Sequence, residues 1–352
     1  MTSGTRRVAL ALDALRHGWP VTVDGALHLL PAETGFGPDV LAPRMLISAA
    51  RAVTLKLANQ REAAMPEAPV LIRGAEPFDL DRARALADPA LDLRFPLKGP
   101  FAAEPLEQAG AARTAMELAR LAGILPAFLV TPSPQGEDTA VSSADLAMWK
   151  APEHLVIASR ARLPVAAAED AEIVVFRATD DLREHVALIV GPQNADRTPL
   201  VRLHSECLTG DILGSLKCDC GPQLHAALAA MAEEARGGGW GVLLYLRQEG
   251  RGIGLVNKLR AYRLQDLGFD TVDANNRLGL PTEARDFPVA ARMLGLLGVP
   301  AIRLMTNNPA KVAALEAVGV TVAERVPHQL PANPHNARYL ATKRDRTGHI
   351  LK

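Results

Sequence analysis

The stretch RLHSECLTGDILGSLKCDCGPQ, from Arg202 to Gln223, is the most informative part of this sequence. It contains all three cysteines of the 352-residue chain, Cys207, Cys218 and Cys220, in a C-x10-C-x-C arrangement. Zinc binds readily to thiolate sulfur, and a catalytic zinc keeps three protein ligands and leaves one position for water. The clustering therefore predicts a zinc site with an open fourth position.

Two alternatives to a catalytic metal site need no metal at all. Intracellular cysteines are often small buried hydrophobic residues, and a secreted protein could join two of them in a disulfide. The clustering argues against the first alternative, and the odd number argues against the second. A structural zinc would need a fourth ligand, for which His204 and His225 are the local candidates.

The composition is that of an ordinary globular protein. A chain of 37.5 kDa favours two domains. The 39 lysines and arginines equal the 39 aspartates and glutamates, so the net charge points to neither nucleic acid nor membrane. No apolar run approaches the length of a bilayer span, and Asp13 and Arg16 interrupt the apolar N-terminal segment, which is unlike a signal peptide. We therefore expect a cytoplasmic protein.

Predicted helices and strands alternate along the chain. Residues 114–122 have helical pattern and end at Gly123, a typical helix terminator. Residues 172–178 and 185–190 predict a pair of strands, and residues 301–308 predict a strand that leads to a helix beginning at Pro309. The predicted fold class is α/β (α+β), with two domains, mixed sheets flanked by helices, and the zinc site in the C-terminal domain at the edge of its sheet.

Two turns have the composition of phosphate-binding turns. Glu249-Gly-Arg-Gly-Ile-Gly places Arg251 among flexible glycines, and the run MTNNPAKV puts Lys311 in the first turn of a helix. Each could equally be a structural feature, a glycine turn in one case and a capped helix with a solvated lysine in the other. Glu283 and Arg285 stand two residues apart in a predicted loop, where most such pairs are surface charges. Together with a three-thiolate zinc, which would activate water at neutral pH, these groups favour hydrolysis of a nucleotide.

From about Ser159 to the C-terminus the sequence closely resembles the GTP cyclohydrolase II family. The matching stretches are RLHSECLTGD, SLKCDCGPQL, LLYLRQEGRGIGLVNKLRAYRLQDLGFDTVDAN, ERVP and LMTNNPAKV. The resemblance implies hydrolysis of GTP to a diaminopyrimidine, formate and pyrophosphate, the first step of riboflavin biosynthesis. It also implies one zinc ion per subunit, Mg²⁺ with the substrate phosphates, and a homodimer without nucleic-acid or membrane partners.

The resemblance also implies the roles of individual residues. Cys207, Cys218 and Cys220 match its zinc ligands. Arg285 matches the proposed nucleophile toward the α-phosphate, Glu283 stands at the position of the proton acceptor, and Tyr262 matches a tyrosine near the reacting ring. The positions that match GTP contacts are Arg202, Leu203, His204, Ser205, Glu206, Gln223, Glu249, Gly250, Arg251, Thr271, Thr306 and Lys311.

The sequence departs from the family pattern at Glu283, where the family usually has aspartate. The extra methylene moves the carboxylate by about 1.5 Å on ordinary bond lengths. A misplacement of that size can cost on the order of a hundredfold in rate, unless the backbone compensates.

Residues 1–158 resemble, more faintly, the dihydroxybutanone phosphate synthase domain that is often fused ahead of this enzyme, and residues 159–352 form the predicted cyclohydrolase domain. The run GAARTAMELARLAGILPAFLV has the pattern of that synthase's helix and strand. However, GALHLLPAETG replaces its acidic DREGD-type cluster, and Gly110-Ala-Ala-Arg113 replaces its Gly-His-Thr-Glu motif. We expect a degenerate domain that is inactive as a synthase and serves dimer contacts or stability.

The sequence leaves two further functions open. One is a related zinc nucleotide hydrolase with an altered substrate or an incomplete reaction, which Glu283 favours. The second is a non-catalytic regulatory protein that binds zinc and nucleotide. A zinc-stabilised nucleic-acid or regulatory module is the form of it that the balanced charge, the absence of a fourth cysteine and the two phosphate-suited turns argue against.

Overall fold

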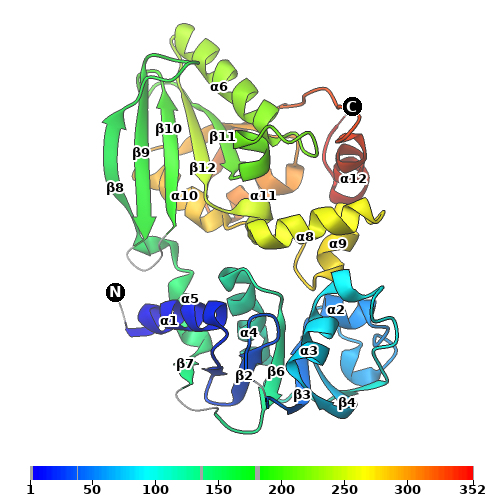
Figure 1. The fold of residues 1–352 in the computed structure, drawn as a ribbon. Helices are drawn as coiled ribbons and strands as arrows, with labels where there is room; N and C mark the ends of the chain where they lie inside the picture. The colour runs from blue at the N-terminus through cyan, green and yellow to red at the C-terminus, as the bar shows by residue number, and fades with distance from the viewer. Residues whose placement is uncertain (1–2, 38, 135–137, 179–182, 352) are drawn as a thin grey trace. The chain divides into compact units, whose positions relative to one another are not determined.

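The computed structural model describes residues 3–37, 39–134, 138–178 and 183–351, and its contacts divide the chain into two compact units (Figure 1). Unit 1 comprises residues 1–151 and 252–284, and unit 2 comprises residues 152–251 and 285–352. The predicted domain boundary after residue 158 falls inside strand β8 (Leu155–Arg162) and stays a prediction.

Unit 1 contains a mixed sheet with helices on both faces. Across its described residues the strand order is β5-β4-β3-β6-β2-β1-β7, with one parallel pair, β1 and β7, and antiparallel pairs elsewhere. The strands are β1 (Val21–Val23), β2 (Leu27–Pro31), β3 (Ala42–Ile47), β4 (Val70–Phe78), β5 (Phe101–Glu104), β6 (Ala127–Thr131) and β7 (Thr139–Val141). The helices are α1 (Ser3–His17), α2 (Ala49–Thr54), α3 (Leu80–Ala87), α4 (Ala109–Ala122), α5 (Ser143–Trp149), α8 (Leu255–Asp266) and α9 (Thr271–Arg277).

The alternation of side chains along the strands builds two cores in unit 1. On β3, Met45 and Ile47 pack with apolar residues of α2, α3, α8 and α9, whereas Leu46 packs on the opposite face with α1, α4 and α5. Successive residues of a strand point to opposite faces, so one strand contributes to both cores. The segment 252–284 belongs to unit 1 because α8 and α9 fill the first of these cores.

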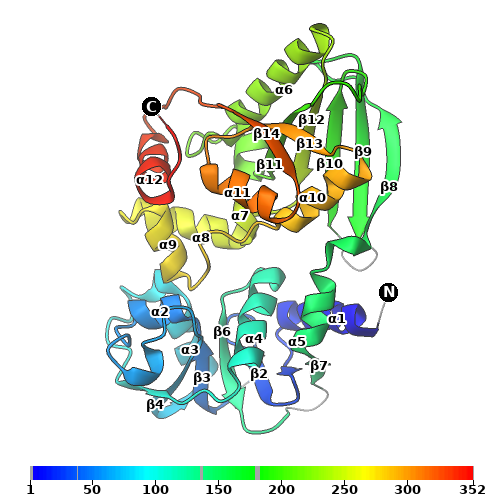
Figure 2. The same cartoon turned by 180° about the vertical axis from the view of Figure 1, so that it is seen from behind.

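Unit 2 contains a second mixed sheet, which Figure 2 shows from behind. The strand order is β14-β13-β11-β12-β10-β9-β8 across the described residues; β14, β13, β11 and β12 run parallel, and the other neighbours are antiparallel. After β8 come β9 (Ala171–Ala178), β10 (Glu184–Val190), β11 (Leu200–Ser205), β12 (Gly241–Leu246), β13 (Ala301–Met305) and β14 (Thr321–Val326). The helices are α6 (Cys220–Arg236), α10 (Phe287–Leu296), α11 (Pro309–Ala317) and α12 (Ala337–Thr347), and the turn α7 spans Glu249–Gly252.

Helices cover both faces of this sheet as well. Ala227 and Met231 of α6 pack with Leu200 and Leu243 on one face. Helices α10 and α11 pack on the other face, around a core that includes Val242. The prediction of two α/β domains with mixed sheets flanked by helices is confirmed.

The cysteine stretch was expected at the edge of the sheet. It follows the carboxyl end of β11, which lies between β12 and β13, so it lies at the edge formed by the strand ends and not beside an edge strand. The order of strands depends on long-range pairing, which local sequence patterns do not contain.

Among the helices of the described residues, none combines the length and the apolar character that crossing a bilayer requires.

A buried ion pair anchors α2 in unit 1. The Arg51 side chain is 2% exposed, donates two hydrogen bonds to Asp92 at 2.6 and 3.0 Å, and donates a third to the carbonyl of Leu86 at 2.8 Å. Burial works to raise the pKa of Asp92, but hydrogen bonds from Arg51 and Lys98 outweigh it and hold the pKa below its usual value. The pair depends on both partners being present.

We expect Arg51→Met to destabilise unit 1 by about 3 kcal/mol, because removing one partner leaves the other charge partly buried and unpaired. Urea denaturation would measure the change. Arg61→Met is the control: its side chain is 96% exposed beside Glu62, and exposed pairs contribute about 0–1 kcal/mol. Equal effects of the two substitutions would contradict the importance of the buried pair.

Candidate functional site

The three cysteines come together in unit 2. Cys207 follows β11, Cys218 precedes the first turn of α6, and Cys220 begins that helix. Their sulfur atoms all lie within 4.8 Å of one another, with 3.7 Å between the Sγ atoms of Cys207 and Cys218. None of these three cysteines forms a disulfide, and Cys207 and Cys218 are buried. This geometry suits a single metal ion held by three sulfur ligands.

Two glycines allow the cysteine segments to approach each other. A Cβ on Gly210, in the π-helical turn Leu208–Ile212, would lie 2.9 Å from Cys218 Sγ and 3.0 Å from Cys207 Sγ. A Cβ on Gly221 would lie 2.2 Å from the carbonyl oxygen of Gly210. Only glycine fits at either position, so the turn and the first turn of α6 pack backbone against backbone.

The clustering also disfavours ionisation of two of the thiols, Cys218 and Cys220. Hydrogen bonds from Cys207 and Cys218, followed by burial, raise the pKa of Cys220 well above its usual value, and the hydrogen bond with Cys207 raises the pKa of Cys218. A bound cation reverses this balance, since coordination favours the thiolate. The cluster is therefore suited to a metal ion.

Neither candidate histidine belongs to the cysteine cluster. Within the described residues the metal-compatible group consists of the three cysteines. The His204 side chain is 4% exposed, and its Nε2 lies 3.0 Å from Asp211 Oδ1. Asp211 Oδ2 accepts hydrogen bonds from the backbone N–H of Cys207 at 3.0 Å and from the Tyr245 hydroxyl at 2.9 Å. His204, Asp211 and Tyr245 thus hold the backbone of a cysteine and leave the fourth position of the cluster to another ligand.

A second network surrounds Arg202, a buried residue of β11. Its guanidinium donates to the carbonyl of Met305 at 2.9 Å and to Gln223 Oε1, whereas its buried Nε has no hydrogen-bond partner in the described structure. Burial lowers the pKa of Arg202 to about 10, so it remains a cation at neutral pH. Gln223 Nε2 in turn donates to Asp219 Oδ2 at 2.6 Å. The free Nε hydrogen is available to an acceptor from a ligand.

Several of the remaining predicted residues follow the carboxyl ends of parallel strands in unit 2. β11 and β12 pair from Leu200↔Gly241 to Ser205↔Leu246, and β13 pairs with β11. Because ends of parallel strands meet at one edge of the layer, three segments converge there: 205–207, 247–251 and 306–311. Ligands commonly bind at such a position in α/β proteins.

Contacts in these segments are mostly polar. Glu249 accepts from the backbone N–H of Leu208 at 2.7 Å, and Glu206 pairs with Arg247 at 2.9 Å. Lys311 is buried and donates to the carbonyl of Leu203 at 3.0 Å. Thr306 is buried, and its hydroxyl accepts from the N–H of Asn308. Ser205 ends β11 and is partly buried.

The turn at Gly250 and Arg251 has an unusual backbone. Both residues adopt left-handed conformations, with φ of 64° and 61°. A non-glycine residue in this region is strained, and such strain persists where the surrounding structure requires it, often at binding sites. The predicted phosphate turn is therefore a defined structure rather than a flexible glycine loop.

Four predicted residues remain, of which one belongs to unit 2 and three belong to unit 1. In unit 2, the Arg285 guanidinium lies 5.7 Å from the centre of the Phe287 ring. Tyr262, Thr271 and Glu283 belong to unit 1. There Lys258 Nζ lies 5.7 Å from the Tyr262 ring centre, Thr271 begins α9, and Glu283 is exposed in the segment before α10. Their predicted roles stay predictions.

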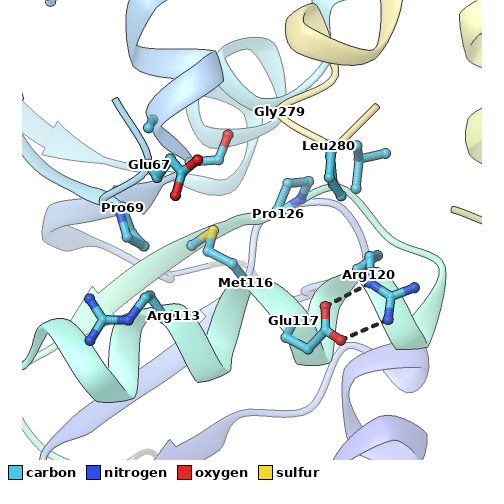
Figure 3. A pocket seen from close by; sticks show the side chains of 12 residues that line it. Glu67, Pro69, Arg113, Met116, Glu117, Arg120, Pro126, Gly279 and Leu280 are labelled. Carbon is cyan, nitrogen blue, oxygen red and sulfur yellow. Dashed lines mark hydrogen bonds and ion pairs between the residues drawn. The ribbon is translucent and has the colours of Figure 1, made fainter. Parts of the chain in front are cut away.

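Unit 1 has a cavity of about 200 Å³ of its own (Figure 3). Its walls come from α4, from the start of α2, and from the segments around Pro69 and Leu280. Glu117 forms an ion pair with Arg120 at 2.6 Å on one wall. None of the predicted site residues lines this cavity.

Sequence reasoning assigned no role to Tyr245 and Lys343, and it interpreted Asp211 and Asp219 only as residues that suit a polar, open pocket around the cysteines. Asp211 and Asp219 stand inside the cysteine stretch, so their charge next to predicted ligands was the available signal. Tyr245 and Lys343 carried no such signal, because both lie far from the cysteines in sequence and meet the aspartates only in the folded unit.

We expect Gly210→Ala to lower the metal content of the purified protein well below that of the wild type, because its methyl group would displace two sulfur ligands. Elemental analysis of protein purified without chelators measures the metal per chain. Gly295→Ala, in α10, is the control: a Cβ there meets no atom within 4 Å. A Gly210→Ala protein with full metal content would contradict this account of the cluster.

A pH dependence of stability follows from His328. Burial, followed by the charge of Arg202, lowers the pKa of His328 to about 4, against about 6.5 in an unfolded chain. Between these values the unfolded state binds more protons, so stability is complete above pH 6.5 and is lost as the pH falls toward 4. Thermal unfolding of chelator-treated protein should show a lower midpoint at pH 5 than at pH 7. We expect a smaller decrease for His328→Asn, and an unchanged decrease would contradict this assignment.

The sequence matches the family model described as GTP cyclohydrolase II over residues 156–327. It is 42% identical over 371 aligned residues to a GTP cyclohydrolase-2 of Azospirillum brasilense, covering 98% of this chain and 94% of the relative. It is 49% identical to a riboflavin biosynthesis protein RibBA of Salinispora arenicola and 44% identical to one of Bacillus cereus, in each case over 70% of this chain. These alignments cover 62% and 66% of the two relatives, so the chain spans slightly less than two thirds of their length.

A solved structure of RibBX, a two-domain 3,4-dihydroxy-2-butanone 4-phosphate synthase from A. baumannii, aligns over 91% of this chain with 17% identity and a TM-score of 0.31. A score of that size does not establish a common fold. The family rests on sequence instead: with 42% identity across 98% of its length and a matching family model, this chain belongs to the GTP cyclohydrolase II family.

Proposed function

We propose that this chain is a zinc-dependent GTP cyclohydrolase II that converts GTP, by ring opening, into a diaminopyrimidine, formate and pyrophosphate in riboflavin biosynthesis. The observation that carries the proposal is the intact cluster of three cysteines in a chain related to a GTP cyclohydrolase-2 over nearly its whole length. The open fourth position supports a catalytic rather than a structural metal, since structural zinc sites are closed by four protein ligands.

We propose Cys207, Cys218 and Cys220 as the zinc ligands. A zinc ion held there would supply a Lewis acid and lower the pKa of a bound water toward neutrality, which hydrolysis at C8 of guanine requires. Asp211 would keep Cys207 in place through its hydrogen bond to the Cys207 N–H. Hydrogen bonds of this kind orient the residues that bind a metal ion.

The triphosphate would be bound by cations near the cluster. The unpartnered Nε–H of the buried Arg202 supports a contact with the substrate, because a buried donor without an acceptor is costly and a ligand oxygen would satisfy it. The left-handed turn at Gly250 and Arg251 supports a contact between its backbone and a phosphate. Mg²⁺ would neutralise part of the phosphate charge, and Thr271, Thr306 and Lys311 complete the proposed contacts.

Arg285 is proposed to act on the α-phosphate and so release pyrophosphate, with Glu283 as the proton acceptor and Tyr262 beside the reacting ring. These roles rest on the family resemblance of the surrounding motifs. The equal numbers of acidic and basic residues support a small-molecule substrate without a nucleic-acid partner. We also propose that the protein is a cytoplasmic homodimer and that residues 1–158 form an inactive, synthase-like domain.

The proposal is tested by incubating purified, zinc-loaded protein with GTP and Mg²⁺ while formate, pyrophosphate and the diaminopyrimidine are followed together. We expect all three products from the wild type and no formate from Cys218→Ser, which lacks a metal ligand. Arg236→Ala is the control, because that side chain is 71% exposed at the end of α6.

Two outcomes would change the assignment. Pyrophosphate without formate would show that the step at the α-phosphate proceeds while the zinc-dependent ring opening does not. A zinc-loaded wild type that releases no product would contradict the proposed enzyme and favour a nucleotide-binding regulatory protein.

A further inference from the structure

Helix α12, near the C-terminus, places a partly buried cation against the cysteine segment. The Lys343 side chain is 13% exposed, and its Nζ donates to Asp219 Oδ1 at 2.8 Å. The Asp219 side chain is 8% exposed. The two residues stand 124 positions apart in the chain, and both belong to unit 2. Removing both charges from water costs free energy. The attraction between them offsets this cost only when their geometry is good and their remaining hydrogen bonds are satisfied.

Asp219 is a sensitive position because it separates Cys218 from Cys220. It is the N-cap residue of α6, where an aspartate usually accepts a backbone hydrogen bond, yet its side chain makes no such bond. Its two oxygen atoms bind Lys343 Nζ and Gln223 Nε2 instead, at 2.8 and 2.6 Å. The carboxylate therefore ties the residue between two metal ligands to helix α12.

The same carboxylate is the first member of a continuous chain of polar contacts. Asp219 orients the amide of Gln223, and the opposite side of that amide, Oε1, accepts from the guanidinium of Arg202. The amide can serve both partners only in one orientation, with its nitrogen toward the carboxylate and its oxygen toward the guanidinium. Lys343 thus acts on Arg202 through two intermediate side chains.

The charges give Lys343 a second effect. Asp219 adds a negative charge next to the thiols, and the ammonium of Lys343 balances it. Without that ammonium, an unbalanced carboxylate would remain close to Arg202 and would weaken the attraction of the site for an anionic ligand.

We propose that Lys343 is a positioning residue: it fixes the Asp219 segment between two metal ligands and, through Gln223, orients Arg202 toward the phosphates of the substrate. The effect on substrate rests on the function proposed above, whereas the effect on the metal segment does not. In the described structure Lys343 contacts Asp219 and Tyr339, neither of which is a proposed reacting group, so its loss weakens binding of the substrate and of its transition state alike.

The first measurement is steady-state kinetics of Lys343→Met with GTP. We expect KM to rise about tenfold or more, in the range typical for residues that support ligands from behind, with kcat within about threefold of the wild type. Lys343→Arg, which keeps the charge, should recover most of the affinity. Arg344→Met is the matched control on the same helix, since that side chain is 53% exposed and pairs with Asp345.

The second measurement needs no turnover. Zinc loss to a chromogenic chelator should be about tenfold faster in Lys343→Met than in the wild type or in Arg344→Met. A purely structural role would lower the thermal midpoint and leave both KM and the zinc-loss rate of the folded protein unchanged.

The double variant Asp219→Asn/Lys343→Met removes both charges and keeps the experiment decisive if Lys343→Met folds poorly. Its zinc loss and KM should be closer to wild type than the two single effects combined predict, since coupled residues are not additive.

Zinc loss at the wild-type rate in Lys343→Met, or additive effects in the double variant, would overturn the inference. An unchanged KM in Lys343→Met, measured beside an active wild type, would also overturn the inference. An inactive wild type would refute the proposed function alone, and zinc loss would then decide the role of Lys343.

Discussion

The arrangement of unit 2 depends on holding three thiols within 4.8 Å of one another. Cys207 makes ionisation of Cys218 less favourable, and Cys207 and Cys218 together make ionisation of Cys220 less favourable, so the pKa values of Cys218 and Cys220 are raised. The cluster is therefore stable in one of two ways, as neutral thiols or as thiolates around a cation. Much of its surroundings can be understood as support for the second state, since the backbone and the neighbouring charges hold the sulfur atoms together.

Two aspartates provide that support from different directions. Asp211 is held by His204 and Tyr245 and fixes the backbone of Cys207. Asp219 is held by Lys343 and fixes the segment between the other two cysteines. Burial works to raise the pKa of Asp219, but the charge and hydrogen bond of Lys343 outweigh it and keep the carboxyl ionised. Both aspartates accept several hydrogen bonds, which is the condition under which a buried carboxylate is tolerated.

Much of the fold was accessible from local patterns. The helix ending at Gly123, the paired strands β9 and β10, and the strand leading to Pro309 were all predicted, because periodicity and helix-capping residues act over a few positions. The place of β11 in the interior of the sheet could not be predicted, since strand order follows from pairing between distant segments. The packing of α8 and α9 in the first core of unit 1 likewise cannot be read from local patterns, because their apolar residues show that they are buried but not against which sheet.

The sequence by itself determined the chemistry of the site. Three clustered cysteines, the glycine turn around Arg251 and the family motifs need only neighbouring residues to be recognised. The tertiary structure alone decided which charges serve that site. Lys343 is one of 39 lysines and arginines, and nothing local distinguishes it from a solvated surface residue. Its role arises because folding places it, partly buried, against the buried Asp219, where water screens the two charges less and each requires the other as its partner.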